Sequence, residues 1–317
     1  MSMINRVRTA VAAVAFATAL PAVAIDSVKM LIPANPGGGW DTTGRELGKA
    51  MQASGAVKSV QYDNKGGAAG AIGIAQFVNS AKGDPNAMMM GGMVMVGGLI
   101  QNKSPVTIEQ VTPLARLTSE FEVIVVPANG PRTLKELLDK FKANPGSVSW
   151  GGGSAGGTDH ILAGLVAKAI GVEPAKVNYV PFKGGGEAVS AIIGGHVTAG
   201  ISGLSEFSQH IKSGKMRALA VSSPKAMEGI ASLKEQGVNV ELANWRGIFG
   251  APGITPAQRD ELIKALDKAV KSKEWKETLK KQDWEDFWLA GDEYARFIAE
   301  ENKRLGGILK DLALGKK

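Results

Sequence analysis

The chain has 317 residues, of which 44% are hydrophobic and 41 are glycine, so it is long enough to bury a large α/β core in one or two domains. Its formal net charge of +7 is too mild to indicate a nucleic-acid partner. The chain contains no cysteine, which excludes disulfides, thiol catalysis and zinc sites built on cysteine.

The first 24 residues have the order of a secretory signal peptide. Arg6 and Arg8 precede an apolar stretch at residues 9–20, and small residues ending at Ala24 follow. The apolar stretch is too short to span a bilayer, and no later stretch is long enough either. We therefore expect an exported protein whose signal peptide is cleaved after Ala24.

A strand, a glycine-rich loop and a helix then follow one another repeatedly. The strand-like runs are residues 28–32, 60–63, 148–150 and 177–182, and each gives way to a loop and an amphipathic stretch. Alternating strands and helices predict parallel sheets, with ligands at the carboxyl ends of the strands. A fifth candidate is the run 197–201, after which Ser202 and Ser205 are suited to cap a short helix.

Three of these loops contain glycine triplets, at residues 37–39, 151–153 and 184–186. Glycines let the backbone approach a ligand closely, and the start of the following helix presents unpaired N–H groups with partial positive charge. The three triplets together predict a divided site for a small anion. The alternative is three tight strand-to-helix turns without a ligand.

The end of the chain consists of helices that look like packing elements. Thr255 and Pro256 form a helix start, and a second helix is expected from Asp292. Trp275, Trp284 and Trp288 are expected to anchor this region to a core, and an aromatic binding role is the alternative. The methionine cluster within residues 88–95 is interpreted as packing in a buried strand, with a soft-metal site as its alternative.

Two strand-like runs, at residues 122–127 and 245–252, are candidate crossings between lobes. They would divide the mature chain into lobe 1, residues 25–123 with 247–317, and lobe 2, residues 124–246. The first triplet would then face the other two across a cleft that closes by hinge bending.

The second triplet also imitates two enzyme motifs. Gly151, Gly153 and Gly156 match the GxGxxG pattern of dinucleotide-binding proteins, and Ser154 lies in a GxSxG pattern typical of hydrolases. The exported serine hydrolase is the main alternative function. The chain has 3 histidines, without paired spacing, so a metal site is not expected.

Several segments in the same order resemble the exported substrate-binding proteins of tripartite tricarboxylate transporters, the Bug or TctC family. They are PGGGWD at 36–41 followed by Arg45, the loop at 64–70, GGGSAGGTDH at 151–160, PFKGGGEAV at 181–189, GGHV at 194–197, LSE at 204–206 and RALAVSSP at 217–224. Phe182 and the LSE segment look nearer to the citrate-type branch of this family.

The resemblance implies a type II-like, two-lobed α/β periplasmic binding protein, each lobe a mainly parallel sheet flanked by helices. Such a protein is a monomer without catalytic activity, cofactor, metal or nucleic acid. It captures a small organic carboxylate, here a citrate-like di- or tricarboxylate, and delivers it to integral membrane transporter subunits.

The ligand-binding residues that follow lie in loops at the ends of strands. They are Gly37, Gly38, Gly39, Trp40, Asp41, Asn64, Ser154, Thr158, Asp159, His160, Lys183, Gly184, Gly185 and Ser202. We also expect that Lys65, Lys183 or Arg246 can reach a second carboxylate, and that Glu187 points to solvent.

Overall fold

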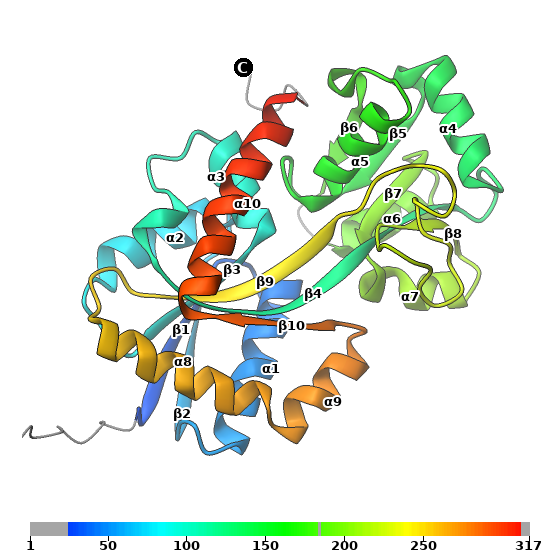
Figure 1. Cartoon of the computed structure of the whole chain (residues 1–317). Helices are drawn as coiled ribbons and strands as arrows, with labels where there is room; N and C mark the ends of the chain where they lie inside the picture. The colour runs from blue at the N-terminus through cyan, green and yellow to red at the C-terminus, as the bar shows by residue number, and fades with distance from the viewer. Residues whose placement is uncertain (1–24, 183–184, 312–317) are drawn as a thin grey trace, which may run out of the picture.

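A computed structural model describes residues 25–182 and 185–311 as two α/β lobes joined by long crossing strands (Figure 1). The predicted signal peptide, Lys183 and Gly184 lie outside these described residues. Within them, no helix is long and apolar enough to cross a membrane.

The sheet of the first lobe begins with three parallel strands, β1 (Ser27–Ile32), β2 (Ser59–Asn64) and β3 (Ala87–Gly92). It continues through strand β9 (Ala243–Gly250), antiparallel to β3, and through the long strand β4 (Thr112–Pro127), with which β10 (Glu285–Ala290) pairs. The helices of this lobe are α1 (Gly39–Ala53), α2 (Ala71–Ser80), α3 (Met93–Gln101), α8 (Pro256–Val270), α9 (Lys273–Lys281) and α10 (Gly291–Asp311).

The second lobe repeats this plan. Strands β5 (Ser149–Gly152), β6 (Asn178–Pro181) and β7 (Ala199–Gly203) are parallel, and β4 lies antiparallel to both β7 and β8 (Met216–Val221). Its helices are α4 (Leu134–Ala143), α5 (Thr158–Ala169), α6 (Gly185–Ile193) and α7 (Leu204–Lys212). Four short 3-10 turns complete the chain, at Ala68–Gly70, Ile108–Gln110, Pro145–Ser147 and Pro174–Lys176.

Strand β4 connects the two sheets because it changes partners along its length. Its residues up to Phe121 pair with β9, and from Glu122 onward it pairs with β7 and β8. Figure 1 shows β4 and β9 running side by side from one lobe into the other. Side chains on these two strands therefore lie where the lobes meet.

The second half of β4 is buried on both faces, as its alternating contacts show. Ile124 and Val126 belong to the main hydrophobic core, whereas Val123 and Val125 pack in a separate cluster with residues of α6 and α7 such as Phe207. Because successive side chains of a strand point to opposite faces, one apolar run supports helices on both sides of the sheet.

Several local predictions are confirmed by these elements. Thr255 caps α8 in a reciprocal capping box with Gln258, and the Trp275 and Trp284 side chains are buried. The methionine cluster is buried, but the expectation of a single strand is wrong in part. Strand β3 ends at Gly92, so Met93 and Met95 lie in α3.

The separate hydrophobic cluster that contains Val123, Val125 and Phe207 provides a stability test. Phe207→Ala removes a fully buried ring from it and should lower the free energy of unfolding by about 3–5 kcal/mol, measured by urea denaturation. Ile193→Ala on the neighbouring helix α6 is the control, because that side chain is 37% exposed. Equal losses in the two variants would contradict the packing assigned to Phe207.

Candidate functional site

A cavity of about 410 Å³ lies between elements of the two lobes. From the first lobe it receives the loop before α1, Arg246 of β9 and the segment after α9; from the second it receives α6 and α7. The lining residues are Gly37, Gly38, Gly39, Thr42, Gly186, Val189, Ser205, Glu206, His210, Arg246, Gln282 and Trp284.

The starts of α1, α6 and α7 all reach this cavity. Helix α1 follows Gly38 and α7 follows Gly203, and no side chain caps either helix. The first N–H groups of a helix have no partner within the helix and carry partial positive charge, so an uncapped start attracts an anion. The first and third triplets thus contribute to one site.

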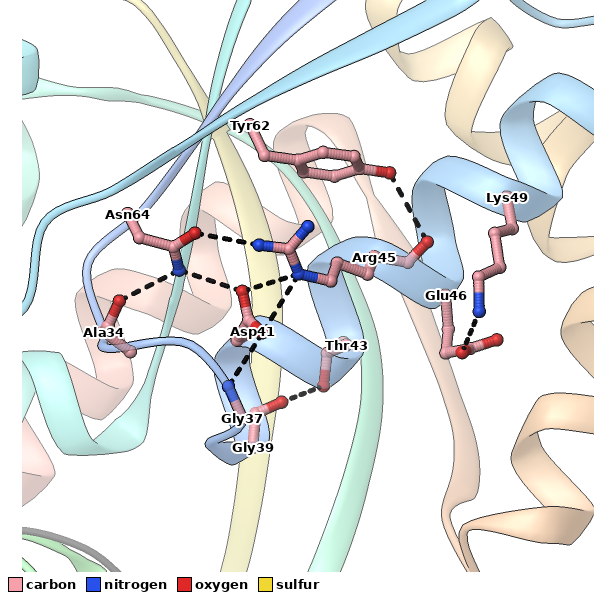
Figure 2. Close-up of polar contacts among 10 residues, drawn as sticks. All are labelled: Ala34, Gly37, Gly39, Asp41, Thr43, Arg45, Glu46, Lys49, Tyr62 and Asn64. Carbon is pink, nitrogen blue, oxygen red and sulfur yellow. Dashed lines mark hydrogen bonds and ion pairs between the residues drawn. The ribbon is translucent and has the colours of Figure 1, made fainter.

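The loop before α1 is held by Asp41, whose carboxylate points toward Arg45 and Asn64 (Figure 2). One of its carboxylate oxygens, Oδ2, accepts the Gly37 N–H at 2.9 Å, and Oδ1 accepts bonds from Arg45 Nε and Asn64 Nδ2, both at 2.9 Å. Asn64 also donates to the Ala34 carbonyl at 3.0 Å. These bonds fix the glycine loop to the end of β2, and leave Asp41 and Asn64 as braces of the site.

The electrostatics of Asp41 agree with this bracing role. Burial raises its pKa, but the hydrogen bonds from Arg45, Gly37 and Asn64 outweigh burial and lower the pKa below the usual aspartate value. The carboxylate therefore stays charged at neutral pH, and its charge is compensated by Arg45 rather than exposed to a ligand.

The floor of the cavity contains a buried ion pair between the two crossing strands. Arg246 of β9 pairs through Nη2 with Glu120 Oε1 of β4, and the two side chains are 5% and 3% exposed. Arg246 Nη1 also donates to Thr43 of α1 at 3.1 Å, and Ser205 of α7 donates to Glu120 at 3.1 Å. One ion pair thus connects both crossing strands with a helix from each lobe.

Close packing at this pair explains why two neighbouring positions are glycine. A Cβ atom at Gly39 would lie 2.6 Å from the Arg246 guanidinium, and one at Gly203 would lie 2.7 Å from the Glu120 carboxyl carbon. The guanidinium also packs against Trp284, 5.0 Å from the ring centre. Both starts, α1 and α7, can therefore approach the ion pair only without a side chain.

The second triplet forms a neighbouring but separate loop, whose residues do not line the cavity. Asp159 Oδ2 accepts the Gly153 N–H at 2.6 Å, and Tyr179 donates to the Gly153 carbonyl at 3.0 Å. His160 Nδ1 accepts the Gly156 N–H at 3.2 Å, and its ring stacks on Tyr179 at 4.1 Å. Two N–H groups of the GxGxxG loop are thus used inside the protein.

This loop does not have the arrangement of a hydrolase. Ser154 is exposed, and within the described ranges its side chain forms no hydrogen bond with a histidine. Burial lowers the pKa of His160 to about 4, so its imidazole is neutral at neutral pH and its Nδ1 is engaged by the backbone. The His160 side chain is therefore a part of the packed loop.

Beneath this loop lie two carboxyl groups with strongly perturbed titration. Glu122 of β4 is fully buried, and neither of its carboxyl oxygens has a hydrogen-bond partner among the described residues. Burial, then the nearby Asp159 and Glu120, raise its pKa well above the usual value. Burial also raises the pKa of Asp159 to about 7, against the opposing bond from Gly153.

The predicted site residues thus fall into three groups. Gly37, Gly38 and Gly39 line the cavity; Gly185 begins α6 one residue before the lining Gly186; and Ser202 supports the lining Glu206 through a 3.0 Å hydrogen bond. The others lie behind the cavity wall or in the neighbouring loop: Trp40, Asp41, Asn64, Ser154, Thr158, Asp159 and His160. Lys183 and Gly184 lie outside the described residues.

Several residues that line the cavity were not among the predicted site residues. Ser205 and Glu206 directly follow strand β7, so the strand-to-helix rule that gave the other loops could have found them. Gln282 and Trp284 come from the connection between α9 and β10, where no local motif marks a site. Arg246 was expected to reach a ligand carboxylate, and it lines the cavity.

Two α/β lobes with a polar cavity between them are the architecture of a protein that binds a small ligand. The sequence profile described as "Tripartite tricarboxylate transporter family receptor" matches residues 45–314. The chain belongs to this family. It is therefore a substrate-binding receptor and not an enzyme, and the hydrolase alternative is wrong.

Individual relatives agree with this membership. The protein BugT of Bordetella pertussis is 26% identical over 292 residues, which cover 90% of this chain and 88% of BugT. A Cupriavidus necator UPF0065 protein is 29% identical over 197 residues, which cover 61% of this chain and 59% of that protein.

Solved structures share the fold. A TctC solute-binding protein from Polaromonas has a TM-score of 0.70 at 27% identity, covering 90% of this chain and 98% of that one. MatC from Rhodopseudomonas palustris, solved with malate, has a TM-score of 0.76 at 18% identity, covering 90% and 99% of the two chains. A second protein of that organism, solved with adipate, has a TM-score of 0.79 at 20% identity, covering 91% and 97%.

The bracing role of Asp41 gives a stability prediction. Asp41→Ala leaves the Gly37 N–H without its acceptor and removes one of the two acceptors of the half-buried Asn64 amide, and it should lower the free energy of unfolding by about 1–3 kcal/mol. Asp41→Asn keeps an acceptor oxygen and should lose less. Urea denaturation measures both, and an unchanged stability of the alanine variant would contradict the brace.

The buried carboxyl groups predict an unusual pH dependence. A carboxyl whose pKa is raised in the folded state binds its proton more tightly there than in the unfolded chain, so stability falls as pH rises above the unfolded pKa. Glu122→Gln removes this titration and should raise the free energy of unfolding at pH 8 relative to the wild type.

The same variant should gain progressively less as the pH is lowered toward 5, because the wild-type carboxyl is then increasingly protonated in the unfolded chain too. Thermal denaturation across this range measures the gain. Glu277→Gln on the surface of α9 is the control and should show no such trend. A gain that is constant with pH would contradict the assigned titration.

Proposed function

We propose that this chain is the periplasmic receptor of a tripartite tricarboxylate transporter and binds a small organic carboxylate in the cavity between its lobes. The observation that carries the proposal is the meeting of helix starts from both lobes, those of α1 and α6, at one cavity. Family membership and the malate and adipate bound by two proteins of the same fold support it.

The expected contact energies agree with weak to moderately tight binding of the ligand. A helix start contributes about 0.3–1 kcal/mol toward an anion at an exposed site, and a charge-assisted hydrogen bond about 1.5–3 kcal/mol. A few such bonds from Gly38, Gly39, Gly186 and Thr42 reach the roughly −8 kcal/mol of micromolar binding after ordering costs.

The lobes provide the route for capture and delivery. The two strands that cross between them, β4 and β9, lie under the cavity, so bending there would close the lobes over a ligand. In this proposal the predicted signal peptide directs the chain to the periplasm. There it acts as a monomer that hands its carboxylate to the integral membrane subunits.

The site residues outside the cavity wall have a place in the same proposal. Asp41, Asn64 and Asp159 position the glycine loops, while Ser154 and Thr158 lie on the neighbouring loop of the second lobe. A di- or tricarboxylate would place one carboxylate at the start of α1 and use the opposite wall for its remaining groups.

A charge introduced at the start of α1 tests the anion site. Thr42→Glu introduces an acidic residue where a helix start favours one, so the fold should be retained, but its carboxylate would repel an anionic ligand. Affinity for the preferred acid, found by thermal-shift screening of malate, succinate, citrate, adipate and glutamate, should fall at least tenfold by calorimetry.

The matched control is Thr42→Gln, which is of similar size but neutral and should lose much less affinity. For the unmodified protein, an acid at 100 times its Kd should add about 2.7 kcal/mol of stability. The carboxylate assignment is wrong if a sugar or a cationic ligand stabilises the protein while no organic acid does.

A further inference from the structure

The charge balance of the cavity is unusual for a site that receives an anion. Of the described residues lining it, Arg246 is the only lysine or arginine, and its guanidinium is already paired with Glu120 and bonded to Thr43. Glu206 lines the same cavity. The described Arg246, Glu120 and Glu206 side chains together therefore carry one net negative charge when both acids are ionised.

The Glu206 carboxylate is available to a ligand. Its side chain reaches the surface of the cavity, although it is enclosed enough that burial raises its pKa, and Oε2 accepts the Ser202 hydroxyl at 3.0 Å. In the part of the chain that the structure describes, Oε1 has no hydrogen-bond partner. His210 lies one turn further along α7 and lines the same cavity wall.

Glu206 lies in the first turn of α7, where an acidic side chain stabilises the helix. A carboxylate that only stabilises the start of the helix does not distinguish one ligand from another. Glu206 also lines the cavity, so its charge affects the site itself. Glu206 offsets the positive start of its own helix, which leaves the starts of α1 and α6 as the anion-binding part of the cavity.

We propose that Glu206 determines specificity by accepting a hydrogen bond from a protonated amine of the ligand, so that the receptor takes amino carboxylates in preference to carboxylates without the amine. This inference rests on the proposed function, because it assumes that the ligand carboxylate lies at the starts of α1 and α6. The second carboxylate of a succinate or citrate placed near Glu206 would meet a like charge, whereas an ammonium would form a charge-assisted bond.

Matched ligand pairs test this specificity. Calorimetry at pH 7.5 with the mature chain compares aspartate with succinate, glutamate with glutarate, and 4-aminobutyrate with butyrate. The amine-containing member of at least one pair should bind at least tenfold more tightly. Glu206→Gln should weaken that member at least tenfold and leave its partner unchanged or more tightly bound.

Two further variants separate charge from fold. Glu206→Asp keeps the charge and should keep the preference for the amine. Glu173→Gln removes an exposed carboxylate that does not line the cavity, and this variant should behave as wild type. Thermal denaturation confirms that each variant is folded before binding is measured.

The outcomes separate the role of Glu206 from the proposed binding of a carboxylate. If succinate, glutarate or citrate binds as tightly as the amino carboxylates, or if Glu206→Gln retains the preference, the role of Glu206 is overturned while carboxylate binding stands. If no acid of any pair binds, the proposed function fails, and the inference fails with it.

Discussion

The buried ion pair between Glu120 and Arg246 is the interaction on which the architecture of the site depends. It joins the two strands that cross between the lobes, and through Thr43 and Ser205 it reaches one helix from each lobe. Removing charges from water is costly, and a buried charge left without its partner costs several kcal/mol, so neither residue can be lost alone. The pair therefore sets the floor against which the starts of α1 and α7 are placed.

An aspartate holds the glycine loop at the cavity, and another holds the separate neighbouring loop. Asp41 accepts the Gly37 N–H four residues earlier, and Asp159 accepts the Gly153 N–H six residues earlier. Each aspartate lies in the first turn of a helix and directs its carboxyl group to a backbone N–H inside the protein. Such bracing lets backbone N–H groups be presented in a fixed geometry, which reduces the ordering cost of binding.

The charges around the cleft follow from the same arrangement. Because Arg246 is neutralised by Glu120, recognition of an anion is left to helix starts and hydroxyls, which are weaker and less specific than a free guanidinium. The acids beneath and beside the cavity, Glu122, Asp159 and Glu206, all have pKa values raised by burial, and the nearby Glu120 raises each of them further. Protonation of these acids is therefore linked to the stability of the fold.

Local sequence patterns determined the elements and the class of protein. Apolar runs ended by glycines gave strands and helices, the Thr255–Pro256 cap gave α8, and the order of the glycine motifs gave the family. These signals act over a few residues, so one sequence is enough to read them. The tertiary structure alone decided which side chains share the cavity. Glu206, Gln282 and Arg246 come from distant parts of the chain, whereas Asp41 and Asn64 turn inward to support the loop. A side chain faces ligand or protein according to which partners the folded chain brings within a few ångströms, and that proximity depends on contacts between lobes rather than on spacing in the sequence.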